Sequence, residues 1–152
     1  MKYNLVLQDA VNLIRNLISE KLINNFIGDI KIQVKDDHIS IFFGRYGRAY
    51  RYDICVADTL QQRCTIGFHV NNEALTDSLK AGLKNIADKW DFVTQEQTPI
   101  FLITKNVYKY EVAADMTFKF IKETSSSILS LIRGDVDDEK SGENLGSVPT
   151  KC

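Results

Sequence analysis

The feature that most constrains the fold is a series of four short segments in which hydrophobic and polar side chains alternate. The segments are residues 30–35, 39–43, 49–56 and 64–70, and short polar or glycine-containing turns separate them. A period of two places successive side chains on opposite faces of an extended strand. Short links between such strands are typical of antiparallel pairing. We therefore predict an antiparallel meander with one face against a core and the other toward water.

Helical periodicity surrounds this meander. Residues 5–27 carry a wide hydrophobic stripe with polar residues mostly opposite, as expected for an amphipathic helix. Residues 72–90 return to the helical spacing, and Asn71 or Asn72 is a candidate N-cap for this segment. A last helix is predicted over about 111–133, where hydrophobic residues again recur every three or four positions.

Two more strands are expected between the second and third helices. Residues 92–93 and 100–103 are hydrophobic runs joined through residues 95–99. Because they alternate less than the earlier strands, we expect them to be central or covered on both faces. The predicted fold class is α+β, with an antiparallel sheet of about six strands covered on one face by three helices, in the order α-ββββ-α-ββ-α.

Charge divides the chain into two parts. Of the 152 residues, 44% are hydrophobic and 26% are charged, which suffices for a core without disulfides or metals. Residues 134–152 contain five acidic and two basic side chains, a net charge of −3, which leaves residues 1–133 at +2. We predict a single α+β domain over 1–133 and an acidic, flexible C-terminal tail over 134–152.

Composition also predicts where the protein works. The sequence contains no apolar run long enough to span a membrane and begins without the pattern of a secretory signal. Its three cysteines include no CxxC pair, which favours a reducing compartment and argues against a zinc site. We expect a cytoplasmic protein.

The alternation assigns each side chain of the meander to a face of the sheet. The outward face is expected to stay open, polar and slightly basic, with Phe42 exposed in it. The inward set is Ile30, Ile32, Val34, Ile39, Ile41, Phe43, Tyr50, Tyr52, Ile54, Val56, Cys64, Ile66, Phe68 and Val70. The outward set is Lys31, Gln33, Lys35, Ser40, Phe42, Arg51, Asp53, Cys55, Thr65, Gly67 and His69.

Arginines and tyrosines are interleaved around the turn at residues 44–47. Arginines can pair with phosphates and tyrosines can stack on bases, and the same residue types anchor protein interfaces. The alternation turns Tyr50 and Tyr52 inward, which leaves Tyr46 free to stack. A plain hairpin, a protein contact and a nucleic-acid contact all remain open for this turn.

The sequence offers few groups for catalysis or metal binding. His38 and His69 lack the spacing of metal ligands, so we predict no catalytic residue, no metal ligand and no cofactor. The alternative is a degenerate metal-dependent nuclease, because Asp29-Ile30-Lys31 has the D-x-K form and Glu20 is the nearest further carboxylate. Cys55 and Cys64 point to opposite faces, which excludes a disulfide between them.

The stretch 39–93 resembles a known family. Residues 39–47 read ISIFFGRYG and are similar to the I-x-I-G-R-S-G hairpin of a domain of unknown function in bacterial and archaeal proteins. That domain often accompanies a PD-(D/E)XK-type nuclease domain. Residues 61–70 are similar to its next strand, 72–93 to its following helix and strand, and 116–132 to its closing helix.

The resemblance has departures and brings no catalytic residues. The helix at 72–90 lacks the family's run of lysines and glutamates, and no arginine follows Trp90-Asp91. Type III secretion chaperones, which are also acidic-tailed helix-sheet domains, are similar at the level of the fold. Both resemblances imply an accessory module rather than an enzyme.

We therefore predict a non-catalytic binding or accessory module that engages a partner protein through the open sheet face. It would be an immunity-, chaperone- or defence-accessory-like protein of a bacterial or phage system, and a homodimer is possible. The alternative is a nucleic-acid-binding accessory module related to nuclease-associated domains. The candidate partner-binding residues are Arg45, Tyr46, Arg48, Lys35, Phe42, Arg51 and His69.

Overall fold

The computed structural model describes residues 2–25, 30–43 and 50–134, with side chains over 6–24, 30–43, 50–73 and 75–125. These residues form three α-helices, six strands and a short 3-10 turn. The elements are α1 (Lys2–Asn25), β1 (Ile30–Val34), β2 (His38–Phe43), β3 (Tyr50–Asp58), β4 (Arg63–Asn71), a 3-10 turn (Asn72–Ala74), α2 (Asp77–Lys89), β5 (Val93–Gln97), β6 (Ile100–Tyr108) and α3 (Tyr110–Gly134).

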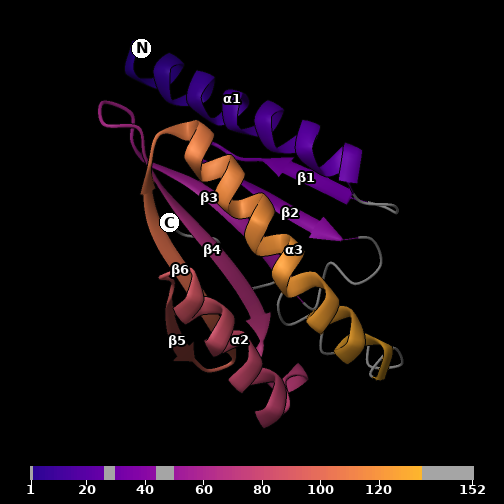
Figure 1. Ribbon diagram of the computed structural model, residues 1–152. Coiled ribbons are helices and arrows are strands. Elements are labelled where there is room, and N and C mark those ends of the chain that lie inside the picture. The colour runs from indigo at the N-terminus through magenta and orange to yellow at the C-terminus, as the bar shows by residue number, and fades with distance from the viewer. Residues whose placement is uncertain (1, 26–29, 44–49, 135–152) are drawn as a thin grey trace.

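All six strands belong to one antiparallel sheet, with the order β1-β2-β3-β4-β6-β5. The chain leaves β4, forms α2, runs along the sheet edge as β5 and returns as β6 between β5 and β4. The three helices lie on the same face of this sheet (Figure 1), with α1 over β1 to β3, α3 over β3, β4 and β6, and α2 beside β5. The predicted fold class and element order are confirmed.

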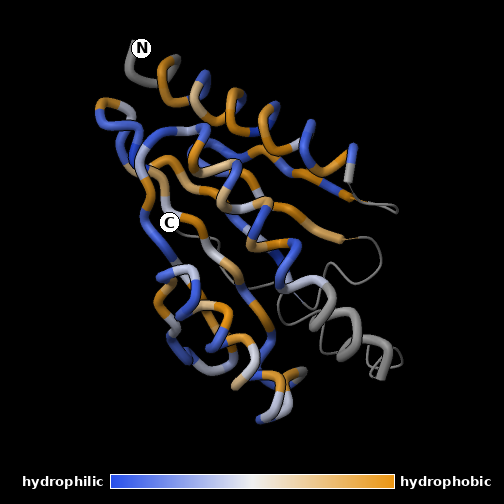
Figure 2. The backbone as a smooth tube through the Cα atoms, viewed as in Figure 1, coloured by the Kyte–Doolittle hydropathy of each residue, from blue (hydrophilic) through white to orange (hydrophobic). Residues whose placement is uncertain are grey.

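The core lies between the sheet and the helices, where the inward side chains of the central strands are buried. Hydrophobic and hydrophilic stretches alternate along the helices (Figure 2), as expected when one helix face packs on a sheet. Tyr52 stacks on Phe68 with ring centroids 4.5 Å apart, and Phe120 of α3 meets Phe68 edge-on at 5.7 Å. Such aromatic pairs contribute about 0.5–1.5 kcal/mol beyond the area they bury.

A hydrogen bond fixes the polar end of this aromatic cluster. The hydroxyl group of Thr124 donates to the carbonyl oxygen of Phe120 at 2.8 Å, so the Tyr52 hydroxyl donates to Thr124 Oγ1 at 2.6 Å. Burial raises the pKa of the Tyr52 hydroxyl well above its ordinary value, which keeps this donor protonated. Helix α3 is thereby tied to the centre of the sheet.

Cys64 is a buried free thiol in the same core. Burial raises its pKa to about 11, so the thiol stays protonated and unreactive at neutral pH. The prediction that Cys64 lies on the inward face of the sheet is confirmed.

The outer strands are more exposed than the sequence suggests. Ile30 and Ile32 of β1 are only half-buried, and Val34 is 43% exposed, because β1 has a neighbouring strand on one side only. The expectation that the last two strands are central or covered on both faces is wrong for β5. It is the outermost strand, and four of its five residues are exposed.

Two boundaries also differ from those expected. The predicted N-cap Asn71 instead caps the 3-10 turn, where its side chain accepts a hydrogen bond from the Glu73 backbone N–H. Helix α2 begins after Thr76, whose hydroxyl accepts from the Leu79 backbone N–H at 3.1 Å. The link between β5 and β6 shortens to Thr98-Pro99, because hydrogen bonding to β6 extends β5 to Gln97.

A left-handed residue ends α2. Trp90 is the C-cap, and Asp91 follows with a φ of 60°. The Phe92 backbone N–H then donates to the Ala87 carbonyl oxygen at 2.8 Å, which satisfies a carbonyl group of the last helical turn. The left-handed conformation suits glycine best and aspartate only moderately.

Replacing this residue with glycine is expected to stabilise the fold. Asp91→Gly should raise the free energy of unfolding by about 0.5–1 kcal/mol, because glycine adopts a positive φ without a Cβ clash. The control Asp88→Gly, at an exposed position inside α2, should lower it by about 1 kcal/mol. Urea unfolding of both variants measures these values, and a loss of stability in Asp91→Gly would contradict the assignment.

Several predicted features fall on residues that the structure does not describe. Asp29, the turn at 44–47 and the acidic segment 135–152 lie outside the described residues. Over the described ranges, none of the helices combines the length and the apolar character that crossing a membrane requires.

Candidate functional site

The candidate site lies on the sheet face opposite the helices, which we call the second face. Strand pairing brings its side chains together: Ser40 pairs with Asp53, Asp53 with Gly67, and Arg51 with His69. The face continues through the register into the outer strands. It comprises Lys31 and Gln33 of β1, His38, Ser40 and Phe42 of β2, Arg51, Asp53 and Cys55 of β3, Thr65, Gly67 and His69 of β4, and Leu102, Thr104 and Asn106 of β6.

A polar cluster centred on Asp53 occupies the middle of the second face. The Ser40 hydroxyl donates to Asp53 Oδ1 at 2.6 Å. The other carboxylate oxygen, Oδ2, lies 3.2 Å from Arg51 Nε and 3.0 Å from His69 Nε2. Both carboxylate oxygens of Asp53 are therefore engaged by donors from three strands. We call Ser40, Arg51, Asp53 and His69 the Asp53 cluster.

The cluster keeps the Asp53 carboxyl ionised. Burial is the strongest single influence and by itself raises the pKa of Asp53. The hydrogen bond and charge of His69, the charge of Arg51 and the Ser40 hydrogen bond act in the opposite direction and outweigh it. The pKa of Asp53 consequently lies below its ordinary value, and the carboxylate acts as a structural anion.

Gly67 makes room for one contact of the cluster. His69 stands directly opposite Arg51, so its ring must lean along β4 to reach Asp53 on the diagonal. A Cβ atom at Gly67 would lie 3.3 Å from His69 Nε2, closer than side chains ordinarily approach. The missing side chain at Gly67 thus allows His69 to lie over the strand and contact Asp53.

The expectation that the second face is open is wrong at its centre. Arg51 and Asp53 are each 2% exposed and Ser40 is 1% exposed, although the described helices all pack on the opposite face. Arg51 was predicted as a contact residue, but its buried guanidinium is paired with Asp53. Alternation identifies the face on which a side chain lies, and it carries no information on what covers that face.

The other predicted contact residues have mixed positions. Lys35 is exposed just beyond β1, Phe42 is half-buried, and the side chain of His69 is 12% exposed and paired with Asp53. The remaining three fall within residues 44–49, which lie outside the described residues: Arg45, Tyr46 and Arg48.

Sequence reasoning missed Ser40 and Asp53 as site residues. The alternation assigns both residues to the outward face, and the spacing between their strands permits Ser40 to lie opposite Asp53. The available sequence signal for Asp53 was Arg51, two residues before it on the same face of the strand. The strand register needed to place Ser40 opposite came only from the structure.

The order of groups in the cluster rules out a serine-hydrolase triad. In such a triad a histidine lies between the serine and the acid and removes the serine proton. Here Asp53 lies between Ser40 and His69, and the Ser40 hydroxyl hydrogen is directed at the carboxylate. Over the described part of the chain, no three acidic, histidine or cysteine side chains are grouped closely enough to bind a metal.

Comparison with family models, with curated proteins and with solved structures found no match. The resemblances to the nuclease-associated domain and to secretion chaperones thus stay predictions.

Neutralising Asp53 is expected to lower the free energy of unfolding at neutral pH and to lower it less in acid. Asp53→Asn leaves Arg51 buried without its counter-charge, which costs about 3–5 kcal/mol. Because the folded pKa of Asp53 lies below the unfolded one, its contribution is complete above about pH 4 and is lost as pH falls through the folded pKa. Chemical unfolding at pH 7, 5 and 3 should show the stability gap narrowing only at the lowest pH.

Replacing Gly67 with alanine should change the free energy of unfolding differently in the presence and in the absence of the His69 side chain. In the wild-type chain Gly67→Ala is expected to be neutral or destabilising, because the new Cβ displaces the His69 ring. In a His69→Ala background the same change should stabilise by about 0.4–1 kcal/mol, since alanine restricts the unfolded chain more than glycine does. A double-mutant cycle by urea unfolding measures both values, and equal effects in the two backgrounds would show that Gly67 does not accommodate His69.

Proposed function

We propose that this chain is a non-catalytic accessory module that binds a partner protein through the second face. One observation carries the proposal. The Asp53 cluster is held by three strands at the centre of a sheet face on which none of the described helices packs. A carboxylate engaged by three donors is unsuited to proton transfer. It is well suited to fixing the side chains around it, which lowers the entropy lost on binding.

The rim of the second face supplies the contacts. Lys31 and Lys35 are exposed, while Phe42 and Leu102 are half-buried. Across β4 and β6, the Thr65 hydroxyl donates to Asn106 Oδ1 at 2.7 Å on the same face. Long basic side chains, an aromatic ring and paired polar groups around a desolvated centre are the ingredients of protein interfaces.

The charge of this face favours protein over nucleic acid. Arg51, the side chain best suited to bind a phosphate in two contacts, is paired with Asp53. Nucleic-acid binding requires several cations that are free to displace counterions, and residues 1–133 carry a net charge of only +2. In this proposal the module acts as an immunity-, chaperone- or defence-accessory-like protein, and its partner is recognised by shape and by local charge.

The contact zone can be tested with two matched double variants. Lys35→Glu with Phe42→Ser alters the rim of the second face, whereas Lys84→Glu with Leu13→Ser makes the same kinds of change on exposed positions of α2 and α1. Affinity capture from cells with quantitative mass spectrometry should lose one specific protein in the first variant and retain it in the second. With the purified pair, calorimetry should show a Kd at least about tenfold weaker for the first variant, equivalent to about 1.4 kcal/mol.

The same experiment separates the competing functions. Equal capture by both variants would remove the second face as the contact zone. A captured nucleic acid, bound with an affinity that falls steeply with salt, would favour the nucleic-acid alternative. Concentration-dependent self-association that only the first variant abolishes would identify a second copy of this chain as the partner.

A further inference from the structure

The centre of the second face is buried more deeply than its own strands explain. Arg51 and Cys55 of β3 are 2% and 5% exposed, although the described helices lie on the opposite face of the sheet. Arg51 also makes an interaction in addition to its ion pair with Asp53. A guanidinium group on an uncovered sheet would leave one of its planar sides in contact with water. Burial this complete therefore requires a further layer of protein over β3.

The buried zone of the second face is narrow. It follows β2 and β3 from the pair His38 and Cys55 to Arg51. On the same face, Lys31 of β1 and Asn106 of β6 are exposed. Strands β2 to β4 together span about 10 Å, because neighbouring strands lie about 4.8 Å apart. A single segment of chain is wide enough to cover this zone.

The bonding of the three cysteines identifies the covering segment. The sulfur of Cys55 is engaged in a disulfide bond. Cys64 is a free thiol buried on the helix side of the sheet, so it is not the partner. The sequence contains three cysteines, and the third is Cys152. Elimination therefore points to Cys152 as the partner of Cys55.

Residues 135–152 have the length and the charge to reach the second face. They number 18 and follow Gly134, the last residue of α3. At about 3.3 Å per residue they can extend over about 60 Å, whereas a fold of this size has a radius of gyration of about 14 Å. Their five acidic and two basic side chains give a net charge of −3. This charge is opposite in sign to that of Lys31 and Lys35 at the exposed rim.

We propose that residues 135–152 lie across the second face and that a disulfide between Cys55 and Cys152 fastens them there. The fastened segment occupies the surface that the proposed function assigns to a partner protein, so its effect on binding rests on that proposal. Opening the disulfide releases the segment and uncovers the Asp53 cluster. Access to the second face thus follows the thiol–disulfide balance of the surroundings.

The bond closes and opens by thiol–disulfide exchange. On closing, the thiols of Cys55 and Cys152 give two electrons and two protons to the disulfide of an oxidant, which becomes two thiols. On opening, one thiolate of a dithiol reductant attacks the bond and releases one cysteine. The second thiol of the reductant then displaces the other cysteine, and the reductant leaves as a disulfide. Cys64 takes no part, because burial raises its pKa to about 11 and keeps its thiol protonated.

Peptide mapping tests the bond. The full-length chain is purified in air, its free thiols are blocked with N-ethylmaleimide in denaturant, and it is cut by a protease that cleaves before aspartate, which separates the three cysteines. We expect residues 53–57, which contain Cys55, to be joined to residues 138–152, and the peptide of Cys64 to carry the label. A labelled Cys55, or Cys55 joined to any other peptide, would overturn the proposal.

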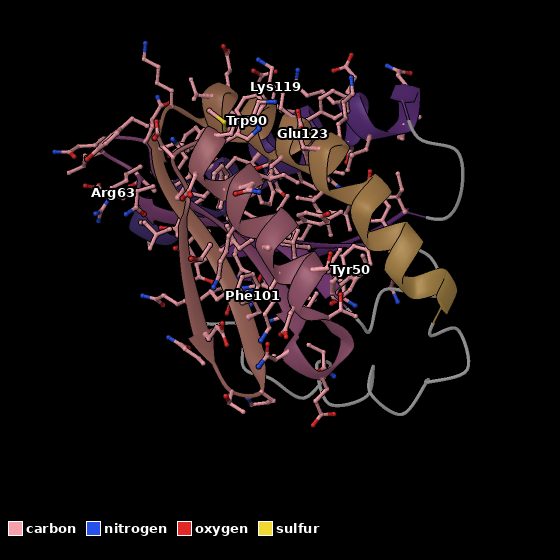
Figure 3. The ribbon with its side chains drawn as sticks, turned by 60° about the horizontal axis from the view of Figure 1, so that its bottom comes forward. Tyr50, Arg63, Trp90, Phe101, Lys119 and Glu123 are labelled. Carbon is pink, nitrogen blue, oxygen red and sulfur yellow. The ribbon has the colours of Figure 1, made fainter. Side chains whose placement is uncertain are left out.

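Solution NMR tests whether the segment covers the face. In the wild-type chain, dithiothreitol should speed exchange of the Arg51 Nε proton with water at least tenfold. In Cys152→Ser this exchange should already be fast and should not respond to dithiothreitol. Trp90 lines a hollow with Lys119 and Glu123 on the helix side (Figure 3), so its indole N–H signal should stay unchanged as an internal control. Slow exchange at Arg51 in Cys152→Ser would contradict the proposal.

A binding measurement separates this inference from the proposed function. For a partner protein that Lys35→Glu with Phe42→Ser fails to capture, the Kd should be at least tenfold weaker with the oxidised chain than with the reduced chain or with Cys152→Ser. Equal Kd values would overturn the control of access and leave the contact zone in place. Joined peptides together with no partner in either redox state would retain the covering segment and remove the proposed function.

Discussion

The register between β3 and β4 is the constraint on which both faces of the sheet depend. It places Tyr52 opposite Phe68 on the helix side and Arg51 opposite His69 on the other side. A shift of one residue would exchange the two sets, which would bury charges beneath α3 and move the aromatic rings out of the hydrophobic core. The hydrophobic cost of that exchange holds the register in place. The core and the Asp53 cluster are in this sense two results of one pairing.

The Asp53 cluster shows how a sheet can contain a buried charge. A carboxylate removed from water is unfavourable unless opposite charges and donors surround it. Strands β2, β3 and β4 each contribute a partner for Asp53. Displacing any one of these strands would therefore remove a donor from the buried carboxylate. A buried ion pair often adds little net stability over a well-packed apolar contact, whereas the loss of one partner is costly because it leaves the other charge buried and unpaired.

The two sides of the molecule differ in how their polar groups are used. On the second face Ser40, Arg51 and His69 each contact Asp53 at the centre, and the exposed side chains lie at the rim. Beside α2 the buried indole nitrogen of Trp90 has no hydrogen-bond partner among the described residues, and Lys122 lies over the Phe118 ring.

Periodicity in the sequence determined the number and order of the elements and the face on which each strand residue lies, because period two and period 3.6 are local properties of the backbone. It therefore predicted that Phe68 faces the core and that Asp53 does not. Tertiary structure alone decided that β5 is an edge strand, that Arg51 is buried, and that Trp90 lines a hollow with Lys122. These properties depend on which elements become neighbours across long stretches of chain, and a local pattern does not contain that information.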